Sequence, residues 1–378
     1  MTIDRIATTQ DLRLVAKRKL PKPIFDFIDG SAFQEITLRA NCEDFDALRF
    51  YLRPLRDVSQ RSLDTTILGQ DSTMPAAIAP IGLGGVAFGN DGEKLAARAA
   101  KKAGIPFTLG MLSIATMDQV HAEIGSFWFQ ICLLKDRGLT KALIDKAIDL
   151  GCPTLVVTVT WNAGGLQSRM TRNAMMLPPK ITPGTLWDFG IKPAWVLRYL
   201  KGKRVAFNNF EGLVPDPGDL AHIVGQLDNT ATFKDIEWLR SVFPGKIVIK
   251  GINCREDGQA AMDHGADAVS VSNHGGNQLD SAASTISVLP EVVEGVQGRG
   301  EVLLDGGVRS GQDLLKAKAL GANACLLGRA HLFGLAAYGE DGVIKALDLM
   351  RYELDVSVAQ CGLTDVNDAS PDILKSQG

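Results

Sequence analysis

The sequence predicts an α/β fold, a TIM (β/α)8 barrel. From residue 75 onwards, eight short apolar runs alternate with amphipathic helical segments. The runs are nearly continuous in Val, Ile and Leu, which is typical of strands buried on both faces of a parallel sheet. A doubly wound sheet is the alternative, but that fold does not require eight strand–helix units. No G-x-G-x-x-G turn follows the first run, which disfavours a Rossmann dinucleotide site.

The barrel is preceded by an N-terminal helical segment, residues 1–70, with helices expected at about 9–18 and 22–30. The first twenty residues lack the apolar core of a signal peptide. No eighteen apolar residues run together, so the sequence predicts no spanning helix. We therefore expect a cytoplasmic protein whose residues 1–378 form a single barrel domain.

Eight strands are expected, and the helical segments between them, such as EKLAARAAKKAG, end in a glycine that suits a helix C-cap. The first four strands are AAIAP (76–80), FTLG (107–110), FWFQICL (127–133) and TLVVTV (154–159). The second four are KIVIKG (246–251), AVSVS (268–272), EVLLDGG (301–307) and ACLLGR (324–329).

The connection between the fourth and fifth strands, residues 160–245, is much longer than one helix requires. Long insertions of this kind are usually lids or binding loops, so we interpret 174–235 as a lid over the barrel mouth. A contact with a membrane surface is the alternative. It is suggested by aromatic and basic residues in the insertion, namely Trp187, Phe189, Trp195, Tyr199, Phe210, Lys201, Lys203 and Arg204.

Composition argues against several classes of function. The net charge is −3, and no basic groove interleaved with aromatics is present, so nucleic acid is not expected as a partner. The six cysteines are far apart and form no C-x-x-C pair. They indicate reduced thiols, with neither a disulfide framework nor a metal site.

Polar residues stand at the carboxyl ends of the expected strands, where barrel enzymes collect their reacting groups. The last two strands end in LLDGGVRS and LLGRA. Two Gly–Arg ends on adjacent strands predict a phosphate site, with simple tight turns as the alternative. Lys250 ends the fifth strand, and a buried ammonium needs an anion or an electron-rich atom beside it. A structural salt bridge would meet that need as well.

His274 follows the sixth strand in the stretch SNHGGN. A lone histidine is more often a core residue with its hydrogen bonds satisfied. Its position between Asn273 and two glycines, at the end of a strand, favours a general base.

Four stretches, IVIKG, SVSNHGGNQLD, VLLDGGVRSGQD and LLGRA, resemble the FMN-dependent α-hydroxy-acid oxidases and dehydrogenases. That family includes glycolate and lactate oxidases and mandelate dehydrogenases. The resemblance implies a barrel that binds FMN, a homotetramer or octamer, His274 as the catalytic base and Lys250 as a catalytic cation that stabilises the reduced flavin. The implied FMN-binding residues are Ala79, Pro80, Ile81, Gln130, Thr158, Lys250, Ser272, Asp305, Gly306, Gly307, Arg309, Gly328 and Arg329.

The same resemblance implies an altered substrate pocket. The family holds a 2-hydroxy acid with two arginines and two tyrosines, and an aspartate orients the histidine. Neutral amides in place of both guanidinium groups predict a substrate other than a simple small 2-hydroxy acid. Loss of the aspartate lowers the proton affinity of the histidine. Phe27 and Cys132 stand at the two tyrosine positions, and Thr160 stands at the aspartate position. Gln167 and Asn277 stand at the two arginine positions.

We therefore expect FMN-dependent oxidation of a CH–OH or CH–NH2 group in a small-molecule or peptide-derived substrate. Amines are included because SNHGGN also resembles flavin enzymes that oxidatively deaminate a modified peptide, although those keep the aspartate that this chain lacks. An ordinary 2-hydroxy-acid dehydrogenase is an alternative if Arg169 or a lid residue holds the carboxylate. A flavin-binding protein without redox turnover is a second alternative, which His274 and Lys250 disfavour.

Overall fold

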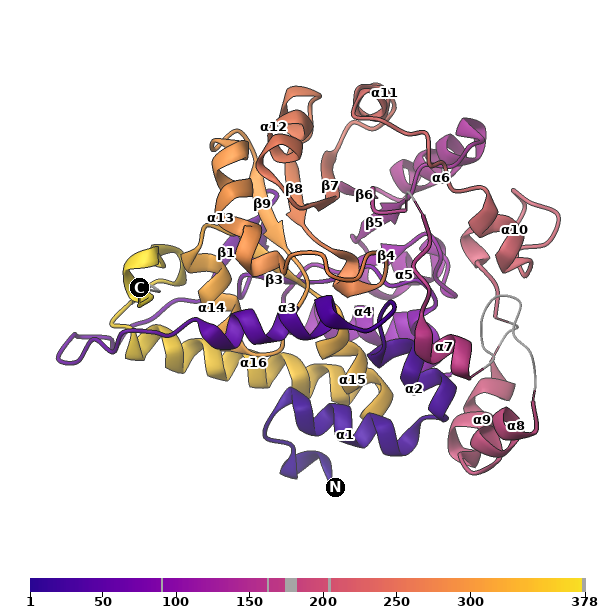
Figure 1. Cartoon of the computed structure of the whole chain (residues 1–378), viewed down its shortest axis with the longest axis horizontal. Helices are drawn as coiled ribbons and strands as arrows, with labels where there is room; N and C mark the ends of the chain where they lie inside the picture. Colours follow the sequence, from indigo (N-terminus) through magenta and orange to yellow (C-terminus); the bar gives the residue numbers. More distant parts are fainter. Residues whose placement is uncertain (90, 162, 174–181, 203–204, 376–378) are drawn as a thin grey trace.

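Eight parallel strands form one sheet in the computed structural model, which describes residues 1–89, 91–161, 163–173, 182–202 and 205–375. The strand order is β3–β10–β9–β8–β7–β6–β5–β4. A bridge between Ile78 and Phe107 joins the two edges, so the sheet closes into a barrel (Figure 1). The predicted TIM barrel is confirmed.

Each expected strand coincides with an observed one, and most are shorter than the apolar run because the run continues into the following loop. The first four are β3 (Ala76–Ile78), β4 (Thr108–Gly110), β5 (Trp128–Ile131) and β6 (Thr154–Thr158). The second four are β7 (Lys246–Ile252), β8 (Ala268–Val271), β9 (Glu301–Leu304) and β10 (Ala324–Leu327).

Both faces of the strands are buried. Val156 and Val248 belong to the cluster that fills the barrel, whereas their neighbours Val157 and Ile249 belong to the larger core between strands and helices. Because successive side chains of a strand point to opposite faces, a strand buried on both faces needs an unbroken apolar run.

A hairpin that the sequence did not predict closes the amino-terminal end of the barrel. Ile67 and Leu68 of the hairpin pack into the barrel interior with Trp128, whose Nε1 donates to Oε1 of Gln70 at 3.2 Å. The site must therefore lie at the opposite end, where the strands finish. The strands of the hairpin are β1 (Thr65–Ile67) and β2 (Gln70–Ser72).

Three helices precede the barrel. The first two, α1 (Thr9–Lys19) and α2 (Lys22–Asp29), confirm the expected pair. Thr8 and Asp11 form a capping box at the start of α1. The third, α3 (Ile36–Ala47), was not predicted, and it contacts the turn that follows β8.

Helices surround the sheet in the alternation expected of this fold, and α16 runs along one edge of the molecule (Figure 1). They are α4 (Gly92–Ala103), α5 (Met117–Ile124), α6 (Arg137–Asp149), α12 (Arg255–Asp263), α13 (Thr285–Val296), α14 (Gly311–Ala319), α15 (Arg329–Tyr338) and α16 (Glu340–Gln360). None of the helices in the described part of the chain has the length and apolar character of a membrane span.

The long connection between β6 and β7 divides into two parts. Helices α8 and α9 lie beside α2 at the edge of the molecule, anchored by the indole N–H of Trp195, which donates to the carbonyl of Val86 at 2.9 Å (Figure 1). Phe207 and Val224, later in the connection, line the cavity at the barrel mouth. Residues 174–181, with Lys203 and Arg204, lie outside the described residues. The helices are α7 (Ser168–Arg172), α8 (Pro183–Gly190), α9 (Pro193–Lys201), α10 (Leu220–Gly225) and α11 (Lys234–Val242).

Candidate active site

A cavity opens at the carboxyl ends of the strands, and we call it the central cavity. Most of the residues predicted for cofactor and substrate line it. They are Phe27, Ala79, Pro80, Ile81, Gln167, Lys250, His274, Asn277, Asp305, Gly306, Gly307, Arg309, Gly328 and Arg329. Five other predicted residues, Gln130, Cys132, Thr158, Thr160 and Ser272, do not line it, and their positions are described below.

A buried ion pair lies in the wall of the central cavity. Nζ of Lys250 is 2.8 Å from Oδ2 of Asp305. Ser272 lies behind this pair and is 1% exposed; its hydroxyl accepts from Lys250 at 3.0 Å and donates to Asp305 at 2.9 Å. The ammonium therefore has the anion that its burial requires. Ser272 positions both partners, and its direct contact with the cofactor stays a prediction.

An irregularity in β7 brings Gly251 and Thr160 close to each other. The register of β7 against β8 shifts between Lys250 and Ile252, and Gly251 has φ +128°. A Cβ atom on Gly251 would lie 2.6 Å from Cγ2 of Thr160. Glycine is therefore required for the carboxyl ends of β6 and β7 to approach here.

The turn that carries His274 is built from left-handed residues. The φ angles are +56° at His274, +63° at Gly275 and +80° at Gly276. Glycine adopts this conformation freely, but histidine does so only where surrounding contacts impose it. The amides of Asn273 and Asn41 supply such contacts through reciprocal hydrogen bonds of 2.7 and 3.0 Å. Helix α3 thereby holds the turn.

The imidazole of His274 has one satisfied and one available nitrogen. Nδ1 lies 2.8 Å from Oγ1 of Thr160, and the ring meets Trp161 edge-on with centroids 5.7 Å apart. Burial, and after it the charge of Lys250, lowers the pKa of His274 to about 4, although the charge of Asp305 opposes this shift. The ring is therefore neutral at neutral pH. If Nδ1–H donates to Thr160, Nε2 keeps its lone pair for a substrate proton.

An anion site lies where β10 meets α15. The helix begins at Arg329, and its N-cap, Gly328, makes no side-chain capping bond, so first-turn N–H groups remain for a ligand. Arg309 lines the same part of the cavity. This donor set suits a phosphate group. Together with the buried Lys250, it fits the phosphate and the electron-accepting ring of FMN.

Gln130, Thr158 and Cys132 form a buried group beside the central cavity. Nε2 of Gln130 donates to the Thr158 hydroxyl at 3.0 Å and to the Cys132 sulfur at 3.4 Å. A Cβ atom on Gly110 would touch both Gln130 and Ile81, so Gln130 is close to the loop after β3. Burial raises the pKa of the Cys132 thiol to about 12, and the thiol is therefore not a nucleophile.

The structure contradicts the expectation that Arg169 holds a substrate carboxylate. Its guanidinium lies 2.7 Å from Oδ2 of Asp29 and 2.7 Å from Oε2 of Glu35, and Arg169 does not line the central cavity. These ion pairs tie α7 to the N-terminal segment. The neutral side chains of Gln167 and Asn277 do line the cavity, as predicted.

The guanidinium that reaches Asn277 is that of Arg329. It donates to the carbonyls of Ile28, Gly275 and Gly30 at 2.9, 3.0 and 2.6 Å, and to Oδ1 of Asn277 at 3.4 Å. Burial, and after it the charge of Arg309, lowers the pKa of Arg329 to about 10. The positive charge remains, but backbone carbonyls occupy its donors.

Trp161 and Asn41 are among the residues of the site that were not predicted. Trp161 stands directly after the fourth strand, and an aromatic residue at that point is a usable signal. Asn41 is a polar residue inside a helix, and nothing in the local sequence shows that it reaches the His274 turn.

Fold and site together define a flavin-binding oxidoreductase barrel. The family model of the FMN-dependent dehydrogenases matches residues 16–376, nearly the whole chain. The chain belongs to this family, and it is an FMN-dependent oxidoreductase.

Individual relatives agree with this assignment. The chain is 38% identical to the L-lactate dehydrogenase of Caulobacter sp. (strain K31), over 98% of each chain. It is also 38% identical to the L-lactate dehydrogenase of Pseudomonas aeruginosa (strain LESB58), again over 98% of each. Among solved structures, it is similar to the monotopic membrane protein (S)-mandelate dehydrogenase. The TM-score is 0.94 and the identity 35%, covering 99% of this chain and 100% of that chain.

Proposed function

We propose that this protein oxidises a CH–OH or CH–NH2 group in a small-molecule or peptide-derived substrate that has no carboxylate beside the reacting carbon. The proposal rests on the partners of two arginines, Arg169 and Arg329, whose guanidinium groups are already engaged by other protein groups. Asp29 and Glu35 pair with Arg169. Three backbone carbonyls occupy Arg329. A carboxylate in the central cavity would therefore lack the paired guanidinium groups that bind it well.

The side chains that face the substrate instead are amides. Gln167 and Asn277 both line the central cavity. An amide offers donors as well as an acceptor, so it hydrogen-bonds to a hydroxyl, an amide or an amine without needing a charge. This chemistry supports a neutral or cationic substrate.

His274 is the proposed base. Nε2 takes a proton from the substrate, while Thr160 accepts the Nδ1–H and holds the ring in the tautomer that this role requires. FMN, when bound at this site, would supply the two-electron acceptor for the oxidation. Lys250, held by Asp305, supplies positive charge in the cavity wall, where it stabilises negative charge that develops on the cofactor side.

The proposal is tested by restoring the cations. The double variant Gln167→Arg/Asn277→Arg should gain flavin reduction by lactate or mandelate under anaerobic conditions. Gln167→Glu/Asn277→Asp is the matched control, and it should not gain it. Unchanged hydroxy-acid reduction in the arginine variant would overturn the proposal that missing cations set the specificity.

An ordinary 2-hydroxy-acid dehydrogenase is the second candidate, and one specific observation favours it. Nη2 of Arg329 lies 3.4 Å from Oδ1 of Asn277, so a cation reaches the expected carboxylate position although Arg169 does not. The relatives named L-lactate dehydrogenase are consistent with this candidate. Rapid reduction of the wild-type flavin by a 2-hydroxy acid would favour it.

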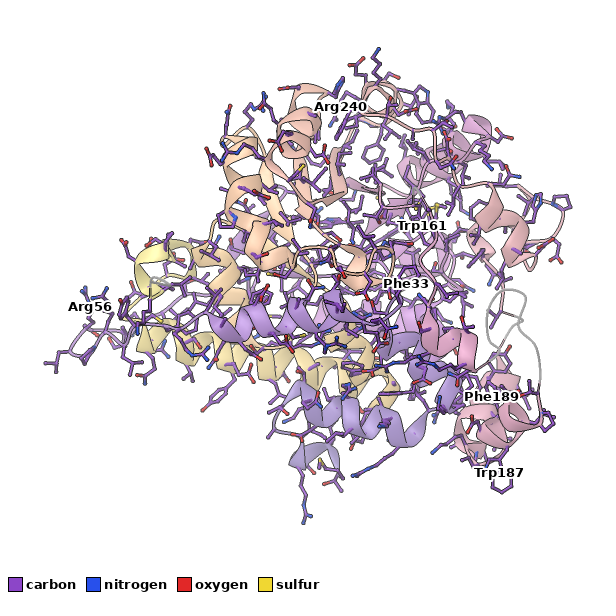
Figure 2. All side chains as sticks on the ribbon, viewed as in Figure 1. Phe33, Arg56, Trp161, Trp187, Phe189 and Arg240 are labelled. Carbon is purple, nitrogen blue, oxygen red and sulfur yellow. The ribbon has the colours of Figure 1, made fainter. Side chains whose placement is uncertain are left out.

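We further propose a peripheral contact with the cytoplasmic face of a membrane through α8 and α9. Trp187 is 71% exposed and points away from the molecule (Figure 2). Leu200 is 70% exposed. Lys192 and Lys201 flank these apolar side chains. An apolar surface beside cations suits the interface of an anionic bilayer. The (S)-mandelate dehydrogenase above is described as monotopic.

Vesicle co-sedimentation tests this contact. The wild type should sediment with vesicles that contain anionic lipid, and Trp187→Ser/Leu200→Ser should not. Tyr352→Ser, at an exposed position on α16, is the control and should behave as the wild type. Equal sedimentation of all three proteins would contradict the contact. The homotetramer or octamer implied by the resemblance remains a prediction, which light scattering tests.

A further inference from the structure

A second cavity, of about 460 Å³, lies next to the central cavity. Trp161, which is partly buried, lines both cavities and is labelled in Figure 2. Thr160, which bonds to His274, also lines the second cavity. The reacting centre and the second cavity are therefore separated by one side chain and one hydrogen bond.

The walls of the second cavity are mostly apolar. Leu227 and Phe233 come from the long connection before β7, Ile236 from α11, and Ile249 and Ile252 from β7. Apolar walls around a space of this size are typical of ligand pockets, whose volumes are about 300–1,000 Å³.

The charged groups of this cavity are acidic. Asp228, Asp235 and Asp257 line it, and no lysine or arginine does within the described part of the chain. Arg137 lies 2.7 Å from both Asp228 and Asp235 and balances part of their charge. A second anionic group on a ligand is therefore disfavoured here.

Two small residues line the part of the second cavity that lies nearest to His274. Cys132 and Thr160 line the second cavity, at positions where the family resemblance places a tyrosine and an aspartate. Both side chains are smaller than the residues of the resemblance, so they take up less of the space on the second cavity's side of Trp161.

We propose that the second cavity holds a bulky, uncharged apolar group of the substrate, aryl or branched alkyl, while the reacting carbon lies beside His274. Trp161 forms the boundary that this group must pass. The inference rests on the proposed function and deepens it, since it specifies the remainder of the substrate.

The test measures binding of unreactive ligands to the FMN-loaded protein by calorimetry, with the flavin absorbance spectrum as a second readout. The ligands are 2-naphthylacetamide, propanamide and 2-naphthylacetate. Ala231 and Thr232 are exposed residues that line the second cavity alone, so Ala231→Trp fills it and Thr232→Trp is an independent filling variant. Ala122→Trp, at an exposed position on α5 that lines neither cavity, is the control.

The wild type should bind 2-naphthylacetamide at least ~10-fold more tightly than propanamide, because the naphthyl group is removed from water. Both filling variants should lose at least ~10-fold in naphthylacetamide affinity and keep propanamide affinity, and Ala122→Trp should change neither. The inference is overturned if the naphthyl group gives no gain in the wild type, or if neither filling variant weakens its binding.

Failure of the proposed function gives a different result. In that case 2-naphthylacetate binds the wild type more tightly than the amide, whatever the filling variants do.

Discussion

Oγ1 of Thr160 lies 2.8 Å from Nδ1 of His274, where the family resemblance places a carboxylate. A hydroxyl satisfies the ring nitrogen but carries no charge to stabilise an imidazolium. Burial and the charge of Lys250 add to this effect, and the pKa of His274 is about 4. The histidine is therefore a free base across the physiological range of pH, although a weaker one than an aspartate-paired imidazole.

Thr160→Asp should raise the pKa of His274, because a carboxylate favours the protonated ring, by about 1–3 units. The base must be unprotonated to act, so kcat/KM falls as pH falls through this pKa. The acid limb of the kcat/KM profile should therefore move to higher pH in the variant, and Thr160→Ser should leave it in place. An acid limb that stays near pH 4 in Thr160→Asp would contradict the assignment of His274 as the base.

His274→Gln removes the base and keeps a side chain of similar size. Flavin reduction by substrate should slow by about 10²–10⁴-fold, the usual contribution of a positioned base. FMN content, measured from absorbance after gel filtration, should not change, since the proposed phosphate site is at β10 and α15. Turnover close to that of the wild type would exclude this role for His274.

Asp305→Asn should destabilise the protein strongly. The substitution leaves the buried Lys250 ammonium without its anion, and breaking a buried ion pair costs about 3–5 kcal/mol. Ser270→Ala is the matched control, because it removes only a neutral donor to Asp305 at 3.2 Å and should cost about 1 kcal/mol. Denaturant unfolding checks both values. Equal losses of unfolding free energy in the two variants would mean that the Lys250–Asp305 ion pair stabilises the fold no more than a single neutral hydrogen bond does.

The folded state should lose stability as pH falls from about 6.5 to 4. Burial lowers the pKa of His331 to about 4, and its Nδ1–H donates to the carbonyl of Leu327 at 2.7 Å. The unfolded chain binds a proton near pH 6.5 that the folded chain does not bind until near pH 4. This difference removes roughly 3 kcal/mol of stability across that interval.

The measurement for His331 is the free energy of unfolding at several values of pH between 4 and 7. His331→Gln should show a shallower decline, because one of the groups that takes up a proton on unfolding is gone. His274→Gln should reduce the decline in a similar way, since its pKa is lowered as far. An identical slope in the wild type and His331→Gln would show that His331 is already charged in the folded state.

The strands and the loop residues that follow them could be predicted, because burial on both faces forces an unbroken apolar run and the polar residue after each run stands out. The β1–β2 hairpin could not, since its short strands carry no such run. Asn41 was also beyond local reasoning, because its partner Asn273 lies more than 200 residues away and only the closed barrel brings them together.

For Arg169, sequence position suggested a role that the folded structure does not give it. Its position in the sequence, two residues after Gln167, allowed a role in binding a carboxylate. The side chain instead pairs with Asp29 and Glu35, which a single sequence does not place nearby. Spacing predicts which residues share a region, whereas ion pairing between distant segments decides which charges remain free.

We expect the wild-type site to receive an uncharged or cationic reacting group. The most direct measurement is an anaerobic titration of the FMN-loaded protein, following the flavin absorbance, with mandelate, mandelamide and 1-phenyl-1,2-ethanediol, and with 1-phenylethylamine for the amine class. Reduction by a neutral compound or by the amine, with mandelate inert or much slower, is the predicted result. Reduction by mandelate ahead of the others would contradict the claim and would point to Arg329 as the cation that receives a carboxylate.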